Sequence, residues 1–532
     1  MNKKKWLKGL IAIIITLGII IRFTNLDLKV YWVDEVINTK YSFGYTEKEL
    51  GEQVKAWNGR VISNQELQKF QSLNPEKNSI DVIKALAIEE PQSPPLYYLL
   101  LRWWTQVFGD SVAIRRSLSA CISLLAFPCV YWLCQELFQS SLTGWLAISL
   151  VAVSPFHLLY AQEVRYYAAW TVVILFASAT FLWAIRRNKI FHWGTYAATL
   201  SLGLYTYPLT GLLAIGHGCY VFIINKFRLN KTVINFILAF LAAILTFAPW
   251  AFFLFTNSHK ISDWRQSKIP LLGLIKAWVI NLQIIFWDFH KNSLWEFPFE
   301  QPIGIVIYYL LTLLTSILLG YTIYFICRYT PTKIWLFIVI MILLPWLPLI
   351  IPDLIKGGIR STVPRYLIPS YLGIQLSVAY LFTRKISSVS ANYKIWQRRL
   401  WLFIVCLVFS MGVVSSLTIS QSKIWWNKGK NNDNYPIAKI INRSTSPLII
   451  DKLTEDDGRS IMSLSYLLEP KVKLQLVYDE SNIPKVAQGF SDMFLVNPSD
   501  ELKEKLEKEQ NFNIELVYQG KRRSLCKLKK AQ

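Results

Sequence analysis

Apolar runs of membrane-spanning length recur through the first 420 residues of this 532-residue chain. A helix needs about 20 consecutive apolar residues to cross a bilayer. Such a segment must be helical, because lipid offers no partners to unpaired backbone groups. The first run ends at Ile21. The other ten cover residues 117–137, 142–161, 166–185, 192–205, 209–224, 233–255, 303–327, 334–351, 366–382 and 400–419. We therefore expect an all-α polytopic membrane protein with about eleven transmembrane helices.

The composition and charge agree with this interpretation. Hydrophobic residues make up 53% of the chain and charged residues only 17%, against about 25% in soluble domains. A soluble or disordered chain is excluded, because so much apolar surface must be buried. The net charge of +23 does not indicate nucleic-acid binding, because basic residues accumulate in cytoplasmic loops of membrane proteins.

The distribution of basic residues predicts the topology. With a cytoplasmic N-terminus, the inside loops are 1–8, 138–141, 186–191, 225–232, 328–333 and 383–399. Together these loops hold 17 Lys and Arg residues, whereas segment 22–93 holds nine basic and eleven acidic residues. This asymmetry places the N-terminus in the cytoplasm and the loop at about 22–112 outside.

Shorter elements are expected within that outer loop. Segment 94–109 is apolar but short, and its tryptophans and Arg102 suit a helix lying in the outer interface. Counting it as a span would put the basic loop 186–191 outside. Segments 46–57, 62–73 and 80–90 are predicted to be short polar helices.

The composition changes after residue 420, where charged residues become frequent. Alternating patterns predict strands at 448–451, 473–477, 493–496, 514–518 and 524–528, and helices near 460–468 and 500–510. We expect a transmembrane domain at 1–420 and a small α/β domain at 421–532. With eleven spans, the second domain is extracytoplasmic.

Four groups of polar residues fall at the outer ends of the predicted spans. Adjacent carboxylates, Asp34 and Glu35, follow the first span, and two acids can serve as a base and an orienting or metal-binding partner. An ordinary solvated pair in a loop is the alternative. The other groups are Gln162, Glu163, Arg165 and Tyr166 between the third and fourth spans, Glu90 and Tyr97 beside the interfacial segment, and Arg360 and Arg365 before the tenth span.

The second of these groups has the chemistry of a phosphate site. In a helix, Gln162 would share a face with Arg165 and Tyr166, and arginine offers a planar fork that matches a phosphate. A helix-end aromatic belt with a snorkelling arginine is the alternative. Because all four groups lie on one side of the bilayer, we expect a site for an anionic substrate whose apolar part stays in the membrane.

The ordered set of motifs resembles the GT-C membrane glycosyltransferases, and most closely their bacterial protein O-mannosyltransferase and lipid A aminoarabinose transferase branch. The resemblance covers roughly residues 1–385. The motifs are Asp-Glu at 34–35, Pro-Pro-Leu-Tyr-Tyr at 94–98, Ser-Pro-Phe-His at 154–157, Gln-Glu-Val-Arg-Tyr-Tyr at 162–167, Leu-Tyr-Thr-Tyr at 204–207 and Arg-Tyr-Leu at 365–367. It implies a GT-C fold and transfer of one sugar, with inversion, from a polyprenyl-phosphate carrier to an acceptor outside the cytoplasmic membrane.

The same resemblance implies roles for individual residues. Asp34 matches the catalytic base, and Glu35 beside it would orient the acceptor. Arg165 and Arg365 would bind the donor phosphate. Substrate binding is assigned to Tyr97, Gln162, Glu163 and Tyr166. The acceptor is a glycolipid, a polysaccharide or a protein, and nucleic acid is not a partner.

Two departures bear on metal binding. Relatives often have histidines where this chain has Ser93 and Tyr207, and some of them bind a divalent cation near those positions. No cofactor is assigned with certainty, and a divalent metal stays open. Glu90 and His217 are the weak ligand candidates, and a packed, hydrogen-bonded histidine is the alternative at 217.

Other functions remain alternatives. A lipid or glycan transporter or flippase should carry charges at mid-membrane and internally repeated halves, whereas here the charges gather at one face. A polymerase or ligase for lipid-linked oligosaccharides should carry its main outer loop later in the chain. A sensor would leave the Asp34–Glu35 pair unexplained.

Overall fold

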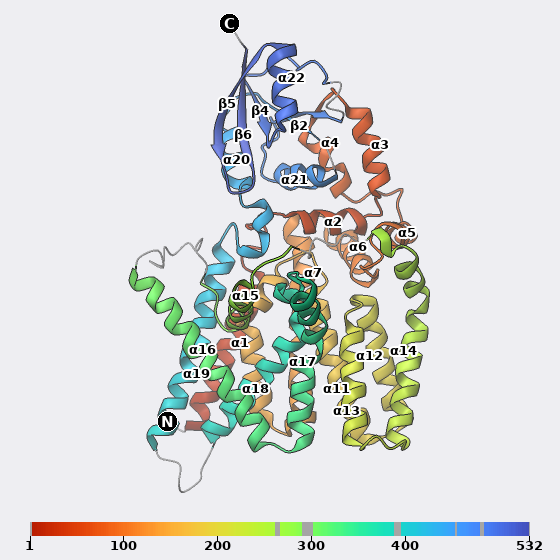
Figure 1. Ribbon diagram of the computed structural model, residues 1–532, viewed down its shortest axis with the longest axis vertical. Helices are drawn as coiled ribbons and strands as arrows, with labels where there is room; N and C mark the ends of the chain where they lie inside the picture. The colour runs from red at the N-terminus through yellow and green to blue at the C-terminus, as the bar shows by residue number, and fades with distance from the viewer. Residues whose placement is uncertain are drawn as a thin grey trace. The chain divides into compact units, whose positions relative to one another are not determined.

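A computed structural model describes residues 3–260, 267–289, 302–387, 395–452, 455–478 and 483–530. The chain forms two compact units, each built from separate stretches of sequence (Figure 1). The helical unit comprises Met1–Leu26, Glu90–Tyr97 and Arg116–Gln421. The sheet unit comprises Asp27–Glu89, Tyr98–Arg115 and Ser422–Gln532. Residues 422–532 therefore fold together with the segment that follows the first span.

The helical unit contains most of the apolar helices of the chain. They are α1 (Lys3–Phe23), α7 (Val112–Leu124), α8 (Ala126–Phe138), α9 (Ser141–Ala152), α10 (Pro155–Ala161), α11 (Tyr167–Arg187), α12 (Ile190–Thr206), α13 (Thr210–Ile224), α14 (Lys231–Thr256), α15 (Leu271–Gln283), α16 (Pro302–Tyr329), α17 (Thr332–Lys356), α18 (Ile368–Ser387) and α19 (Ile395–Gln421). Close packing requires small residues at some crossings. At Gly18, an added Cβ would lie 2.5 Å from the carbonyl oxygen of Ala152, so glycine lets α1 approach α9.

Each of the eleven predicted spans is helical. Within the described residues, seven segments are long and apolar enough to cross a membrane, or eight if the bent pair α9–α10 is one span. Of the remaining three, α12 and α13 are shorter, with 17 and 15 residues, and α18 is almost wholly buried. The chain is therefore a multi-pass membrane protein.

The predicted span at 142–161 is broken, and its two halves meet at 62°. Pro155 is the first residue of α10, and Ser154 before it is extended, as a residue preceding proline prefers. The guanidinium group of Arg22 donates to the carbonyl oxygens of Val151 and Ala152 at the end of α9. A cation at a helix C-terminus satisfies carbonyls that have no helical partner, so Arg22 stabilises the break.

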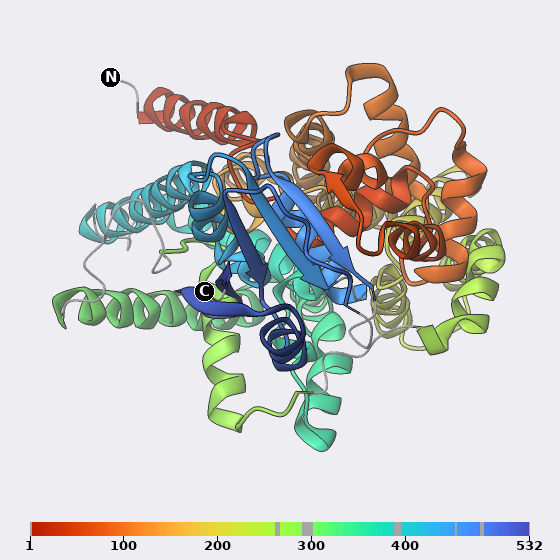
Figure 2. The same cartoon turned by 90° about the horizontal axis from the view of Figure 1, so that it is seen from above.

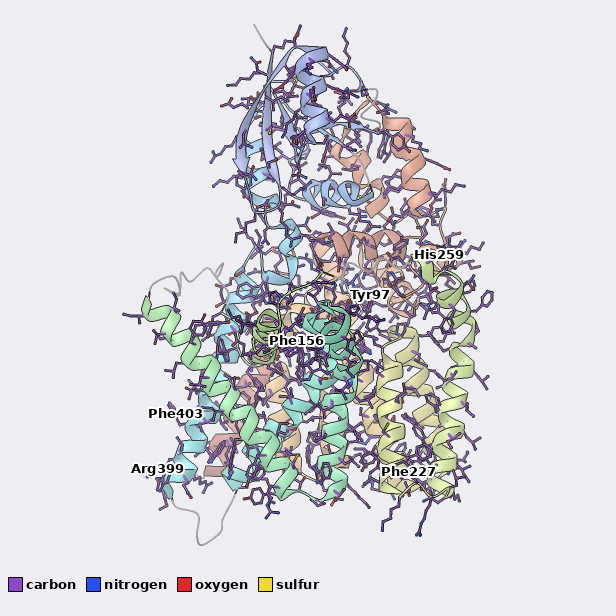
Figure 3. All side chains as sticks on the ribbon, viewed as in Figure 1. Tyr97, Phe156, Phe227, His259, Arg399 and Phe403 are labelled. Atoms are coloured by element: carbon purple, nitrogen blue, oxygen red, sulfur yellow. The ribbon has the colours of Figure 1, made fainter. Side chains whose placement is uncertain are left out.

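The two ends of the helical unit can be followed in Figure 3. Phe227, between α13 and α14, and Arg399, early in α19, lie at one end of this unit. His259, beyond the end of α14, and Tyr97 lie at the other. Two of the predicted cytoplasmic loops therefore share one end of the helical unit.

The sheet unit begins with short helices. They are α2 (Val33–Ser42), α3 (Glu47–Trp57), α4 (Asn64–Gln68), α5 (Ser79–Glu89) and α6 (Leu96–Phe108). Of these, α3 and α4 start at side-chain caps. Thr46 accepts from the backbone of Glu49 at 3.1 Å, and Glu49 accepts from the backbone of Thr46 at 2.9 Å, which is a capping box. With 13 residues, α6 is too short to span a bilayer, in agreement with the prediction for 94–109.

One prediction in this region is wrong. Segment 62–73 is not a single helix, because Val61–Ser63 forms strand β1 before α4 begins. The β1 strand pairs antiparallel with β3 (Lys473–Val477), so the segment after the first span contributes an edge of the C-terminal sheet.

The sheet has six strands in the order β1-β3-β2-β4-β6-β5. The other strands are β2 (Pro447–Lys452), β4 (Asp492–Val496), β5 (Phe512–Gln519) and β6 (Ser524–Lys530). The β2 strand is parallel to both β3 and β4, whereas β6 is antiparallel to β4 and β5. All five strands predicted after residue 420 are confirmed.

Three helices in the described part of the chain accompany these strands in the sequence, and α22 packs against the sheet, as Figure 2 shows. They are α20 (Asn434–Ile441), α21 (Glu455–Ser465) and α22 (Asp500–Gln510). Leu502 and Leu506 of α22 join Leu448, Ile450 and Leu495 of the strands in one buried core. This core confirms an α/β fold for the C-terminal sequence.

Candidate functional site

The predicted carboxylates lie in the first turn of α2, in the sheet unit. Glu35 is fully buried, and its carboxylate forms an ion pair of 2.7 Å with the ammonium of Lys428, which is also fully buried. The backbone N–H of Trp32 donates to the same carboxylate at 3.4 Å. Asp34 is half-buried, so the two neighbouring acids occupy different environments.

Polar contacts hold the rest of α2. Tyr98 donates to the side-chain oxygen of Asn38 at 3.1 Å, and Tyr31 is hydrogen-bonded to Thr39. Burial raises the pKa of Tyr31 well above its ordinary value, although Arg115 opposes the shift. The Tyr31 phenol is therefore neutral near neutral pH.

Arg115 is a second buried cation beside this helix within the sheet unit. Its guanidinium donates to Asp110 at 2.6 Å and to the hydroxyl of Tyr466 at 2.7 Å. It also lies over the rings of Tyr31 and Phe43, at 5.7 and 5.4 Å from their centroids. A buried arginine is stabilised by such charged and aromatic partners.

The second predicted group lies in the helical unit, but not on a helix. The prediction that Gln162, Arg165 and Tyr166 share a helix face is wrong, because α10 ends at Ala161 and α11 begins at Tyr167. Gln162 donates to the carbonyl oxygens of Ile21 at 3.0 Å, Arg22 at 3.4 Å and Thr24 at 3.0 Å. Its amide therefore caps the end of α1. Glu163 is fully buried in the same turn.

This turn and the segment before α18 bring two arginines to one aromatic ring. The guanidinium carbon of Arg165 lies 5.1 Å from the ring centroid of Tyr167, and that of Arg365 lies 5.9 Å from it. Arg165 also donates to the Tyr167 hydroxyl at 3.0 Å. Both arginines are half-buried. Two such cations, held on one side chain, form a site that favours an anion.

Tyr207 lies at the centre of the surrounding aromatic cluster. Its ring centroid is 4.9 Å from those of Tyr166 and Trp170 and 6.5 Å from that of Tyr366. Such pairs add to the free energy of packing beyond simple burial. The cluster fixes the ring of Tyr167, whose centroid lies 6.1 Å from that of Tyr207.

Tyr97 supports the same turn from a distance in sequence. Its hydroxyl lies 2.7 Å from the hydroxyl of Ser119, which donates in turn to the carbonyl oxygen of Arg165 at 3.3 Å. Tyr97 is only 1% exposed. Its contacts therefore make it a support for the Arg165 backbone.

The segment carrying Arg365 is fastened through Asp353, near the end of α17. The Asp353 carboxylate accepts from the backbone and hydroxyl of Ser361, at 2.7 and 2.8 Å, and from Arg360 at 3.3 Å. From α15, Asn281 donates to the carbonyl oxygen of Thr362 at 2.8 Å. These bonds fix the two short 3-10 turns that precede α18.

The residues considered for a metal have other contacts. Both ring nitrogens of His217 lie near hydroxyls, Tyr196 at 3.1 Å and Ser178 at 3.4 Å, and the ring stacks on Phe181 at 4.1 Å. The Glu90 carboxylate accepts from the side chain of Gln92. Across the described ranges, no group of three or more His, Cys, Asp or Glu side chains could hold a metal ion. Within the part of the chain that the structure describes, Glu90 and His217 therefore belong to no group of side chains that fits a metal ion.

Sequence reasoning did not identify Lys428, Tyr167 or Ser119 as parts of these two clusters. Lys428 lies in a lysine-rich segment that looks like a linker, where only the fold reveals its burial. Tyr167 was visible as the second of two adjacent tyrosines, but its partner Arg365 is about two hundred residues away.

The comparisons with known proteins agree with this fold. Residues 92–253 match the family described as dolichyl-phosphate-mannose-protein mannosyltransferase. No curated protein matches the sequence closely enough to count as a relative. The matched stretch includes Tyr97, the turn at 162–166 and Tyr207.

Among solved structures, ArnT from Cupriavidus metallidurans in the apo state is similar, with a TM-score of 0.52 at 13% identity, covering 98% of each chain. The same protein bound to undecaprenyl phosphate gives a TM-score of 0.49 at 13% identity, covering 99% of this chain and 98% of that one. The apo oligosaccharyltransferase of Archaeoglobus fulgidus gives 0.48 at 12% identity, covering 88% and 65%. The first match confirms the expected GT-C fold, and the family match confirms the expected resemblance to membrane glycosyltransferases.

Proposed function

We propose that this chain, with its mannosyltransferase-family stretch at residues 92–253, transfers a single sugar from a polyprenyl-phosphate donor to an acceptor at the outer face of the cytoplasmic membrane. The observation that carries the proposal is the pair of arginines at the Tyr167 ring. The family is named for a donor, dolichyl-phosphate mannose, in which a phosphate joins one sugar to one lipid. An anion site in a multi-pass membrane protein suits such a donor.

The arginines would act on the leaving group. When the bond between the sugar's anomeric carbon and the phosphate oxygen breaks, the phosphate gains negative charge. Arg165 and Arg365 stabilise this charge more in the transition state than in the bound donor. The fixed Tyr167 ring limits movement of both guanidinium groups, so little reorganisation is needed during the reaction.

Asp34 would act on the acceptor. Its carboxylate takes the proton of the acceptor hydroxyl while that oxygen bonds to the anomeric carbon. The polyprenyl phosphate leaves with the electron pair of the broken bond, and attack from the opposite side inverts the configuration. Glu35 has a different position, because its carboxylate is buried against Lys428. Of the two acids, the half-buried Asp34 is therefore the proposed base.

The test is a comparison of lipid-linked sugars and glycoconjugates between a deletion strain and a strain that carries the gene. We expect the deletion strain to accumulate a polyprenyl-phosphate sugar and to lose one glycosylated product, whose mass identifies the acceptor. The Asp34→Asn variant should not restore the product. An unchanged pool of lipid-linked sugars in the deletion strain would rule out the proposed donor class.

A further inference from the structure

The backbone before and within the first turn of α2 is bonded at several points to the sequence after the last span. The backbone N–H of Val30 donates to the carbonyl oxygen of Lys423 at 2.9 Å. Ser463 donates to the carbonyl oxygen of Tyr31 at 2.5 Å. The backbone N–H of Val33 donates to the side-chain oxygen of Asn431 at 3.1 Å. All of these contacts lie inside the sheet unit.

The ion pair between Glu35 and Lys428 is the charged contact among these connections. Both side chains are 0% exposed, with 2.7 Å between their charged atoms. Because Lys428 is fully buried, its ammonium is shielded from solvent while it pairs with Glu35. A buried ion pair contributes little net stability, but loss of one partner leaves an uncompensated buried charge. Such a pair fixes one geometry.

Fixing Glu35 also fixes Asp34. Consecutive residues on a helix point about 100° apart, so one side chain can be buried against Lys428 while its neighbour is half-buried. The turn is bonded on both sides of Asp34, because the backbone N–H of Val33 donates to Asn431 and the Glu35 carboxylate accepts from the backbone N–H of Trp32. A shift of Glu35 would therefore turn Asp34 away from its position.

We propose that Lys428 is a positioning residue for Asp34, and that the sequence after residue 421 supports the helix that carries this base. The proposal rests on the proposed function, in which Asp34 is the base. Lys428 neutralises Glu35, and the neutralised pair holds the first turn of α2. The C-terminal sequence is then required for the orientation of the base, not for binding of the lipid donor.

The experiment compares Lys428→Met with the double variant Glu35→Gln/Lys428→Met in the purified full-length protein. The first leaves Glu35 buried without its partner, whereas the second removes both charges. Lys430→Met is the matched control, because Lys430 lies in the same segment and is exposed. Turnover and donor KM are measured with a synthetic polyprenyl-phosphate sugar from pH 5 to pH 8.

We expect Lys428→Met to lower kcat about 10- to 100-fold at pH 8, as displacement of a catalytic group does, with donor KM unchanged. The double variant should recover most of this loss. The gap between the two variants should close as the pH falls, because burial raises the pKa of an unpartnered carboxylate and protonation removes its charge. Comparing two variants that share Asp34 cancels the titration of Asp34.

Other titratable groups near Glu35 do not explain such a pH effect. The charge of Glu35 interacts with the phenols of Tyr31 and Tyr466, and Arg115 lies beside both rings. Burial raises the pKa of each phenol above its ordinary value. Both phenols therefore stay neutral from pH 5 to pH 8.

A second measurement separates this proposal from the proposed function. Hydrogen exchange of the α2 backbone amides should be faster in Lys428→Met than in wild type or Lys430→Met, and should return toward wild type in the double variant. If the wild-type protein transfers no sugar, the proposed function fails, and exchange alone decides whether Lys428 holds α2. Unchanged hydrogen exchange in Lys428→Met would overturn the positioning role. Equal turnover of the single and double variants at every pH would overturn it as well.

Discussion

The guanidinium groups of Arg165 and Arg365 lie over one ring, that of Tyr167, at 5.1 and 5.9 Å from its centroid. One arginine precedes α11 and the other precedes α18, so the fold joins two distant segments at a single side chain. Positive groups fixed in this way favour an anion, which under the proposed function is the phosphate of the lipid-linked donor.

The first prediction concerns these two arginines. Arg165→Lys and Arg365→Lys keep the charge but lose the planar fork that matches a phosphate. We expect each to lower kcat/KM for the lipid donor. The matching increase in activation free energy is about 1.5–3 kcal/mol, the free energy of a hydrogen bond to a charged group. Arg186→Lys, at the other end of α11, is the control, because Arg186 is half exposed and pairs with Glu136. Wild-type kinetics in both variants would show that Arg165 and Arg365 serve only to anchor helices.

The second prediction concerns Gln162, whose amide caps α1 through three carbonyl oxygens. Gln162→Leu leaves these carbonyls without their donor, so we expect a loss of about 1–3 kcal/mol in stability. Thermal unfolding of the detergent-solubilised protein measures this effect. Donor affinity, measured by titration at a temperature where the variant is folded, should stay unchanged. Weaker donor binding with unaltered unfolding would instead assign Gln162 to the substrate.

The third prediction concerns topology. In a cysteine-free background, we expect Lys48→Cys and Asp500→Cys to react with a membrane-impermeant thiol reagent in intact cells, and Lys189→Cys to react only after permeabilisation. All three positions are exposed. Labelling of Lys189→Cys and Lys48→Cys from the same side would contradict the proposed orientation.

The positions of the long helices could be predicted from the sequence, because an apolar run of spanning length must satisfy its own backbone hydrogen bonds in lipid. The strand at 473–477 was likewise predicted to the residue. The β1 strand was missed because three residues, Val61–Ser63, carry no periodicity of their own and are ordered by pairing with β3. The turn at 162–166 was missed because it contains neither glycine nor proline, and its order depends on the carbonyls that Gln162 caps.

The site was less predictable than the fold. Asp34, Arg165 and Arg365 follow from the ordered motifs, but the motifs do not show which residues surround them. The pairing of Glu35 with Lys428 joins residues almost four hundred positions apart. Only packing of the sheet unit brings these charges together, and no local pattern encodes it.

The fourth prediction is a pH effect on stability from Glu47, which lies 2.6 Å from Lys40 and 3.0 Å from Arg459. Burial alone would raise the Glu47 pKa, but the two cations lower it below its usual value of 4.5. Ionised Glu47 therefore stabilises the sheet unit above that pH, and the contribution disappears as the pH falls through the lowered pKa. Glu47→Gln should cost roughly 3 kcal/mol near pH 7, because Lys40 stays buried without its partner.

Thermal unfolding of wild type and Glu47→Gln between pH 3 and pH 7 measures this difference. The two melting temperatures should converge at the acid end. Glu52→Gln is the control, because the Glu52 side chain is 66% exposed and its contact with Lys48 is long, at 3.9 Å. A constant gap between wild type and Glu47→Gln at all pH values would show that the Glu47 charge is not the cause.

The most direct measurement of the central claim is the turnover of Asp34→Asn with a synthetic polyprenyl-phosphate sugar, together with a separate titration of donor binding. The substitution keeps the shape of the side chain and removes the base. General-base catalysis contributes about 10²–10⁴-fold, so turnover should fall by that factor while donor affinity stays at the wild-type value. Near-normal turnover in Asp34→Asn would contradict the catalytic assignment and, with it, the proposed mechanism.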